Sequence, residues 1–418
     1  MINRVVITGV GLVTPIGIGK EEFWQSLIQG RSGIGKISYF DTSEYPTKIA
    51  AEVKEFDFTN YISSKEANRM DKSTQFSVVA TMLALEDSKL KITEEDPYSI
   101  GVIIGSGIGG VGTFEKQHKI LLEKGPNRVS PFFIPMMISN ISAGEIAIKI
   151  GAKGPNGVIN TACASSTHSI GIAFKLLQKG DTQIIISGGT EAAITPMSLA
   201  GFCKMRALSI QNDDPGHASR PFDKERDGFV MGEGSGILIL ETLQHAIKRN
   251  ANIYAEILGF GMTADAYHIT APSPEGEGAS QAMKIALEDA KIKPTQVDYI
   301  NAHGTSTPLN DKLETLSIKK VFGKHAYNLK ISSNKSMIGH LLGASGGVEA
   351  IATALTIKED VIPPTINYNC PDPDCELDYV PNKAEHKLVK YALSNSFGFG
   401  GHNGVIVLAK YEEDRNFG

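Results

Sequence analysis

The amino-acid sequence predicts an α/β fold in which two similar halves share one site, and three observations support this prediction. Short apolar, β-branched segments alternate with segments of helical periodicity along the chain, which is typical of alternating strands and helices. The strand, small-residue turn and helix around Cys163 have a counterpart between residues 330 and 357, which indicates an internal repeat. The 418 residues are 41% hydrophobic and 21% charged, which is enough to bury a large core in one compact body.

Composition and charge argue against several classes of protein. The formal net charge of −5 gives no reason to expect a nucleic acid or a membrane as a partner. The four cysteines are too few for a disulfide scaffold and show no paired zinc spacing, so we expect reduced thiols and no metal. No apolar run reaches the roughly 18 residues that a membrane helix needs. Because the first residues predict a strand rather than a signal peptide, we expect a cytoplasmic location.

The first half covers residues 1–250. Its predicted strands cover residues 5–7, 100–104, 183–187 and 236–240, with a further strand ending near 159. Its predicted helices cover 21–29, 68–88 and 243–249. The glycine turn at 105–110 matches the spacing G-x-G-x-x-G, but no acidic residue at a strand end about 20 residues further on completes a dinucleotide site. We therefore interpret this turn as the lining of a pocket.

The layout starts again near residue 253, so the second half covers residues 251–411 and leaves a short tail at 412–418. Its predicted strands cover 254–258, 297–300, 330–333 and 405–408. Its predicted helices cover 278–291 and 346–357. The repeated layout leads us to expect that each half supplies one wall of a shared site. Because no low-complexity linker separates the halves, we expect one compact body.

Cys163 lies where an apolar, β-branched run, interpreted as the end of a buried strand, gives way to a helix. A thiol at a helix N-terminus feels unpaired N–H groups and the positive end of the helix dipole, so we expect its pKa to be lowered. Its own backbone N–H is free to face a developing oxyanion. A free cysteine considered alone is more often a buried, inert thiol.

Two of the ten histidines, His303 and His340, stand at the ends of predicted strands in glycine-containing loops, and Lys335 precedes the second of them. A single loop histidine is usually a surface or structural residue. However, strand ends are where sites assemble in α/β sheets. A cysteine, two histidines and a lysine at corresponding loop positions therefore predict nucleophilic catalysis.

Four blocks that carry these residues resemble the signature of the β-ketoacyl-acyl-carrier-protein synthases. They are residues 161–166 (TACASS), 301–307 (NAHGTST), 334–340 (NKSMIGH) and 395–401 (NSFGFGG). The resemblance runs from residue 4 to residue 408 in the family's order, and is strongest to the elongating enzymes of type II fatty acid synthesis. It implies the thiolase-like fold, with duplicated βαβαβαββ halves in five alternating layers (α-β-α-β-α). It also implies a homodimer and an acyl carrier protein as partner.

The chemistry that this resemblance implies is a decarboxylative Claisen condensation of a malonyl thioester. Cys163 would hold the acyl chain as a thioester. His303 and His340 would donate hydrogen bonds to the enolate oxygen formed when the malonyl group loses its carboxylate. The backbone N–H groups of Cys163 and Phe399 would surround the oxyanion of the acyl carbonyl. Decarboxylation drives the reaction, so no cofactor is expected.

The resemblance assigns further residues by their positions in the family's pattern. Lys335, paired with Glu349, would order the site rather than act as a base. Residues expected to contact the substrate are Thr270, Thr305 and Thr307 along pantetheine, and Ile108 and Phe133 along the acyl chain. Residues expected to dock the acidic carrier protein are Lys65, Arg69, Arg128 and Arg206. The chain departs from the pattern at His402, where threonine is usual, and at Asn68, where a basic residue is common.

Other classes of protein fit less well. A degradative thiolase needs a second cysteine in the C-terminal glycine loop, and residues 394–403 contain none. Chain-initiating synthases have asparagine where His340 stands, a modular polyketide synthase needs further domains, and an inactive partner subunit would lack Cys163. A cysteine hydrolase is testable by hydrolysis of acyl thioesters. A free-standing polyketide ketosynthase subunit of the same superfamily stays open as an alternative.

Overall fold

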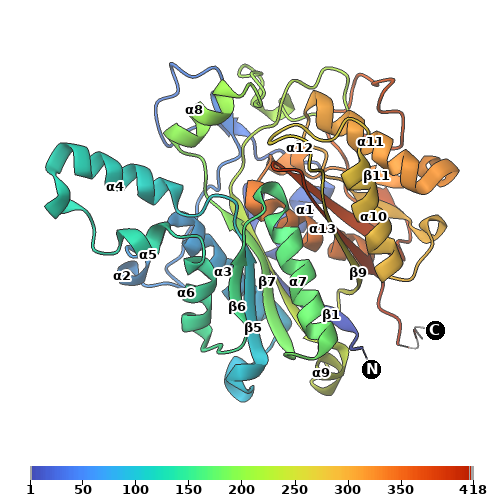
Figure 1. Ribbon diagram of the computed structural model, residues 1–418, viewed down its shortest axis with the longest axis horizontal. Coiled ribbons are helices and arrows are strands. Elements are labelled where there is room, and N and C mark those ends of the chain that lie inside the picture. The colour runs from blue at the N-terminus through green and yellow to red at the C-terminus, as the bar shows by residue number, and fades with distance from the viewer. Residues whose placement is uncertain (1, 414, 416–418) are drawn as a thin grey trace.

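The computed structural model describes residues 2–413 and 415, and it contains one large mixed sheet built from two halves (Figure 1). The first half has the strand order β1 (Val5–Thr14), β8 (Gly234–Thr242), β7 (Ile184–Glu191), β5 (Ile100–Gly105), β6 (Asn156–Ile159). The second has the order β9 (Ala255–Ala264), β15 (His402–Ala409), β14 (Tyr391–Gly398), β10 (Tyr299–Asn301), β11 (Lys330–Ser332).

Both halves show the same pairing pattern. The first three strands of each order are antiparallel neighbours and the last three are parallel neighbours. Residues 5–7 of β1 pair with β9 and join the halves. Identical order and direction in two successive stretches of chain confirm the predicted duplication.

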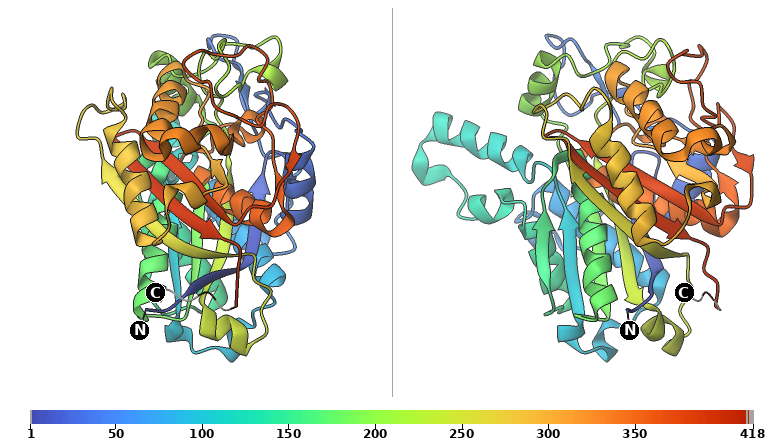
Figure 2. Two further views of the ribbon diagram at one scale, coloured as in Figure 1. Left: turned by 90° about the vertical axis from the view of Figure 1, so that its right-hand side faces the viewer. Right: turned by 45° about the vertical axis from the view of Figure 1, so that its right-hand side comes forward.

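Helices complete five alternating layers (Figures 1 and 2). The central layer contains α7 (Ser165–Lys179) and α13 (Ser345–Glu359), which contact each other and strands of both halves. The outer layers contain α3 (Lys72–Ser88) and α6 (Ile141–Ile150) on one side, and α10 (Glu277–Asp289) and α11 (Pro308–Phe322) on the other. Gly347 lets α13 approach the sheet, because a Cβ there would lie 2.5 Å from the carbonyl oxygen of Gly236.

Several elements differ from the prediction. β1 is longer than the predicted strand 5–7, because Gly9 and Gly11 continue it where α3 passes too close for a side chain. α3 begins at Lys72 because Asp71 caps it and accepts the N–H of Ser73. The expectation of a buried strand before Cys163 is wrong, since β6 is an edge strand and is only partly buried.

Several helices are not predicted from the sequence, among them α6 and α11. The others are α4 (Val111–Lys124), α5 (Phe133–Met137), α2 (Ser64–Ala67), α8 (Pro196–Lys204) and α12 (Lys335–Ile338). We call residues 111–137, which carry α4 and α5, the arm, because they project from the layered body (Figure 1). The remaining elements are α1 (Lys20–Ile28), α9 (Leu243–Lys248), β2 (Gly17–Ile18), β3 (Gly35–Lys36), β4 (Ile49–Ala50), β12 (Val361–Ile362) and β13 (Glu385–His386).

We propose residues 1–250 and 251–411 as the two structural units, since each begins just ahead of the first strand of one half. The predicted tail at 412–418 is described only at residues 412, 413 and 415. Among the described residues, no helix combines the length and the apolar character needed to cross a bilayer.

Candidate active site

Cys163 lies in a sharp turn between an edge strand and a central helix. After β6, Ala162 has φ 50°, a left-handed conformation that an alanine rarely adopts, and a 3-10 turn at Ala162–Ala164 leads into α7. The second half repeats this turn, with Leu342 also at φ 50° before α13. At the position that corresponds to Cys163, the second half has Gly343. The two halves thus share a turn geometry, but only the first half carries a nucleophile there.

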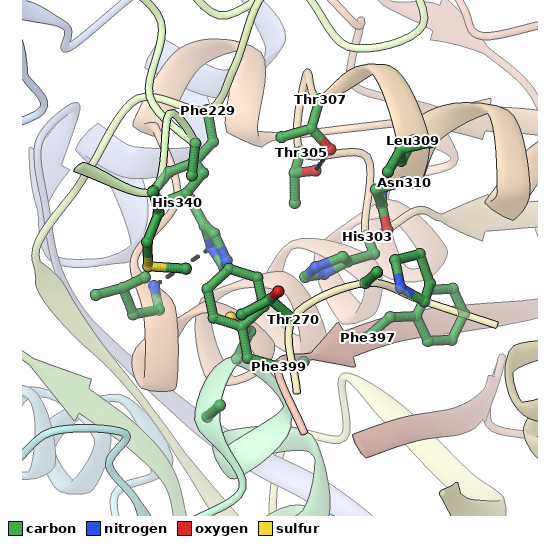
Figure 3. A pocket seen from close by; sticks show the side chains of 18 of the residues that line it. Phe229, Thr270, His303, Thr305, Thr307, Leu309, Asn310, His340, Phe397 and Phe399 are labelled. Atoms are coloured by element: carbon green, nitrogen blue, oxygen red, sulfur yellow. Dashed lines mark hydrogen bonds between the residues drawn. The ribbon is translucent and has the colours of Figure 1, made fainter. Parts of the chain in front are cut away.

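A cavity of about 520 Å³ is lined by residues of both halves, Cys163 among them, and Figure 3 shows part of its lining. Its walls combine a thiol, imidazoles and hydroxyls with apolar and aromatic side chains, a composition typical of a ligand site. The lining includes Ile108, Cys163, Phe202, Arg206, Phe229, Thr270, His303, Thr305, Thr307, His340, Leu342, Phe397 and Phe399. The structure therefore brings together, in one cavity, residues that lie up to 296 positions apart in the chain (107 to 403).

His303 and His340 face each other across the cavity (Figure 3), with ring centroids 5.3 Å apart and planes at 85°. The Nδ1 atom of His340 accepts the backbone N–H of Leu342 at 3.3 Å and lies 2.9 Å from Oγ of Ser345. Because Nδ1 accepts a hydrogen bond, the ring proton lies on Nε2. His340 is therefore oriented to donate a hydrogen bond through Nε2.

Both imidazoles are neutral in the folded protein. Burial lowers the pKa of His303 and of His340 well below 6.5, and the nearby charge of Lys335 acts in the same direction. The backbone N–H of His303 donates to Oε1 of Glu314 at 2.8 Å, which fixes the loop that carries the ring. A neutral imidazole stabilises a developing oxyanion as a hydrogen-bond donor and keeps its own proton.

The expectation that the helix N-terminus lowers the pKa of Cys163 is wrong. Burial raises the pKa of the Cys163 thiol to about 11. The backbone N–H groups of Phe399 and Cys163 and the charge of Lys335 oppose this increase in pKa but do not outweigh it. Cys163 is therefore a thiol at neutral pH, and its proton must leave when the sulfur attacks.

Lys335 and Glu349 form a buried ion pair beside the two histidines. Their side chains are 1% and 0% exposed, and the ammonium group of Lys335 donates to Oε1 of Glu349. Burial alone raises the pKa of Glu349, and the charge of Lys335 opposes that rise. This pairing supports the expectation that Lys335 orders the site, because an ammonium group held by a carboxylate is a poor base.

Phe399 lies in the hairpin turn between β14 and β15. Gly400 and Gly401 in this turn have φ values of 82° and 73°, which glycine adopts without strain. The turn packs directly on the nucleophile, since a Cβ at Gly398 would lie 3.0 Å from the backbone nitrogen of Cys163. The ring of His402, the departure noted above, lies beside Gly400, and the residue is absent from the described lining of the cavity.

The remaining predicted substrate residues do not all reach the cavity. Thr305 and Thr307 line it, with their hydroxyl oxygens 2.9 Å apart, and Thr270 lines it from the opposite side. Ile108 lines it and is 41% exposed. Phe133 does not line the described cavity, because it begins α5 on the arm.

The four predicted docking residues are all exposed, but they do not form one ring around the cavity. Arg206 lines the mouth. Lys65 lies on α2, Arg128 ends the turn after α4, and the guanidinium of Arg69 stacks on Phe132 of the arm at 4.5 Å from the ring centroid. Lys65, Arg69 and Arg128 are absent from the described lining of the cavity.

Several aromatic side chains that line the cavity are not predicted from the sequence. The ring of Phe229 lies 5.4 Å from that of His340, and the ring of Phe397 lies 5.8 Å from that of His303. Phe397 stands inside the block 395–401 and could have been inferred from that position. Phe229 and Phe202 lie in segments with no periodic or motif signal, so only the fold shows their role.

Comparisons with known proteins agree with this geometry. Profiles described as "Beta-ketoacyl synthase, N-terminal domain" and "Beta-ketoacyl synthase, C-terminal domain" match residues 2–246 and 254–369. The chain is 58% identical over 410 residues to "3-oxoacyl-[acyl-carrier-protein] synthase 2" of Synechocystis sp., covering 98% of this chain and 99% of the relative. It is 56% identical over 410 residues, with the same coverage, to the protein of that name from Staphylococcus aureus strain COL.

The solved structures include a type II polyketide ketosynthase in complex with its acyl-carrier protein. It is 35% identical to this chain and has a TM-score of 0.92. The alignment covers 99% of this chain and 100% of the ketosynthase. These comparisons confirm the predicted fold and the predicted activity as a condensing acyltransferase. The chain belongs to the β-ketoacyl synthase family.

Proposed function

We propose that this chain elongates fatty acyl chains by two carbons, through decarboxylative condensation of malonyl-acyl carrier protein with an acyl group held on Cys163. The convergence of Cys163, His303 and His340 on one cavity carries this proposal. The site residues act in two half-reactions, acyl transfer and condensation.

In the first half-reaction, the sulfur of Cys163 attacks the thioester carbonyl of an acyl-carrier protein. The bond from that carbonyl to the pantetheine sulfur breaks. Cys163 loses its proton, and the departing pantetheine sulfur gains one and leaves as a thiol. The N–H groups of Cys163 and Phe399, both of which act on the pKa of the thiol, are proposed to stabilise the oxyanion of the tetrahedral intermediate. The acyl chain is then held as a thioester on the enzyme.

In the second half-reaction, a malonyl thioester occupies the same channel and loses carbon dioxide. The electron pair of the broken carbon–carbon bond forms an enolate, whose oxygen receives hydrogen bonds from His303 and from Nε2 of His340. The enolate carbon attacks the acyl carbonyl on Cys163 and expels the sulfur as a thiolate, which takes a proton from water. The product is a 3-oxoacyl thioester two carbons longer, and no cofactor is required.

The products of the unmodified enzyme test the proposal. We expect an acyl-carrier protein and malonyl-carrier protein to yield one 3-oxoacyl product, two carbons longer, by mass spectrometry. Free fatty acid as the main product would indicate a hydrolase. Several successive additions of malonyl units without reduction would indicate the alternative, a polyketide ketosynthase subunit. Carrier proteins loaded with chains of graded length will also define the preferred substrate.

We propose the carrier protein as a partner that docks at the mouth of the cavity, where Arg206 is exposed and Thr270, Thr305 and Thr307 can bind the pantetheine amides. Lys65, Arg69 and Arg128 are proposed to complete the basic surface. Attraction between this surface and an acidic partner weakens as salt is added.

Replacing Arg128 and Arg206 together with alanine is expected to raise the KM for carrier-bound substrate about tenfold, because two charge contacts are lost. Turnover of short pantetheine thioesters, which lack the protein, should stay nearly unchanged. Alanine at Lys248 and Lys383, exposed lysines outside the cavity, is the matched control and should leave both substrates unaffected. Equal loss on the two substrates in the arginine variant would contradict this docking face.

We propose that Ile108 and Phe399 control admission of the acyl chain. In this gate the ring of Phe399 moves when a chain passes Ile108. Ile108→Phe is expected to lower the acylation of Cys163 by long chains about 5- to 150-fold, because a larger side chain in a packed pocket costs about 1–3 kcal/mol. Short chains and malonyl decarboxylation should be largely unaffected. Acylation rates with carrier proteins of graded chain length measure this, and the parental long-to-short ratio in the variant would contradict the gate.

We also propose that the chain forms a homodimer. The edge strand β6 is only partly buried, and an unpaired edge favours pairing with a second chain. The arm exposes large apolar side chains, with Leu122 73% and Ile134 55% exposed, a pattern typical of an interaction surface. Because Phe133 lies outside the cavity of its own chain, a role in acyl binding requires that it reach the cavity of the second copy. We propose a cytoplasmic location for this assembly.

A further inference from the structure

The carboxylate of Glu191 lies where loops from both halves of the chain meet. Glu191 ends β7, and its side chain is fully buried. Its Oε2 atom accepts the N–H of Gly107 at 2.8 Å and the N–H of Gly343 at 3.0 Å. Its Oε1 atom accepts the N–H of Ile108 at 3.1 Å. Glu191 makes no ion pair within the part of the chain that the structure describes, so backbone N–H groups and the hydroxyl of Ser106, which donates to Oε1 at 3.4 Å, hold this carboxylate.

The packing around this carboxylate requires glycine on both sides. A Cβ at Gly107 would lie 2.8 Å from Oε2, and a Cβ at Gly343 would lie 2.6 Å from the same atom. A Cβ at Gly343 would also lie 2.2 Å from the backbone nitrogen of Gly107. The two loops therefore touch each other, and both donate to one oxygen of Glu191.

Each loop positions a different part of the cavity. Residues 106–109 carry Ile108 along the cavity wall. Residues 340–343 carry His340, whose Nδ1 is held by the N–H of Leu342, the residue next to Gly343. The same carboxylate thus fixes the backbone beside the residue proposed to admit the acyl chain and the backbone that orients a histidine proposed to act on malonyl.

We propose that Glu191 is a positioning residue that locks the Ile108 loop to the His340 loop, so that the fit of the acyl chain and the placement of His340 depend on each other. This inference rests on the proposed function, which assigns acyl binding to the Ile108 loop and malonyl decarboxylation to the His340 loop. Glutamine at position 191 would replace one acceptor oxygen by an NH2 group, which cannot accept an N–H. At least one loop must then lose its contact.

Hydrogen exchange tests the lock without requiring any activity. In Glu191→Gln, amide exchange measured by mass spectrometry is expected to rise at least about fivefold in both 106–109 and 340–343. The matched control is Glu233→Gln, the same change at another buried carboxylate, which Lys72, Tyr39 and Val53 hold outside the cavity. Because the remaining acceptor oxygen can still hold one of the loops, faster exchange in either loop of Glu191→Gln supports the lock, and unchanged exchange in both loops would overturn the inference.

A double-mutant cycle then tests the coupling. Ile108→Phe is expected to lower acylation of Cys163 by long chains. In the Glu191→Gln background this decrease should be about fivefold smaller than in the parental enzyme, because the released loop lets the larger side chain move. Glu191→Gln alone should lower malonyl decarboxylation about tenfold through His340. Glu233→Gln should leave the effect of Ile108→Phe unchanged. Additive effects of Glu191→Gln and Ile108→Phe would reject the coupling.

Gly107→Ala keeps the experiment decisive if Glu191→Gln does not fold. The added methyl group would displace Oε2 of Glu191 without removing the carboxylate, and φ at Gly107 is not in the left-handed region. It should give the same rise in exchange of both loops, and unchanged exchange would overturn the inference. Absence of condensation by the unmodified enzyme would instead reject the proposed function. Because the exchange measurement needs no activity, it tests the lock separately from that function.

Discussion

Replacing Cys163 with alanine is expected to lower the rate of 3-oxoacyl product formation at least about a thousandfold, which corresponds to about 4 kcal/mol of barrier. The physical reason is that the acyl group is no longer held covalently next to the enolate. The carbon–carbon bond would then have to form in a direct reaction with the acyl-carrier protein. Intact-protein mass spectrometry should show no acyl adduct on the variant. Malonyl decarboxylation should persist, because His303 and His340 remain in place.

Cys203→Ala is the matched control for this experiment. Cys203 is a partly buried cysteine on α8 that is absent from the described lining of the cavity. We expect it to keep both the acyl adduct and full condensation. An acyl adduct on the Cys163→Ala variant, or condensation at the parental rate, would contradict the assignment of the nucleophile.

Alanine at His303 or at His340 is expected to lower malonyl decarboxylation about 10²- to 10³-fold, because each ring supplies one hydrogen bond to the enolate oxygen. Transfer of the acyl group to Cys163 should persist, since the N–H groups proposed to stabilise its oxyanion belong to Cys163 and Phe399. The two half-reactions are measured separately, by release of carbon dioxide and by the mass of the acyl-enzyme. His217→Ala, an exposed histidine outside the cavity, should change neither.

The pH dependence of decarboxylation provides a second check on the histidines. Burial and Lys335 hold the pKa of both rings well below 6.5, so the neutral forms are already present at pH 6. Decarboxylation should therefore stay level as the pH rises from 6 to 8. A fall in rate centred near pH 6.5 would show that a protonated ring is the donor, and loss of acyl transfer with intact decarboxylation would reverse the assigned roles.

The turn at Cys163 shows what local sequence can predict. The β-branched run, the small residues and the helical periodicity that follow it are consecutive in the chain. They define a strand, a tight turn and a helix without reference to distant residues. For the same reason the periodic segments of both halves predicted most strands and the helix α13. The four blocks, each a local stretch, were enough to indicate the family.

Elements whose boundaries depend on a neighbour were less predictable. β1 continues through Gly9 and Gly11 only because α3 lies against them, and glycine alone would suggest the end of a strand. β6 is an edge strand because nothing in the described chain pairs with its outer side. Helix α11 has weak helical periodicity, so the sequence pattern did not distinguish it from a loop. Helix α4 of the arm is clearly amphipathic, and its pattern was a signal that could have predicted a helix.

The sequence by itself indicated the nucleophile, the two histidines and the lysine of the candidate site, because each stands in a motif whose residue types their chemistry requires. Only the tertiary structure decided their ionisation and their supports. The pKa of Cys163 is raised because distant segments close over the thiol and remove water, a cost that no local pattern contains. The contact between Gly107, Gly343 and Glu191 likewise exists only because the two halves fold against each other.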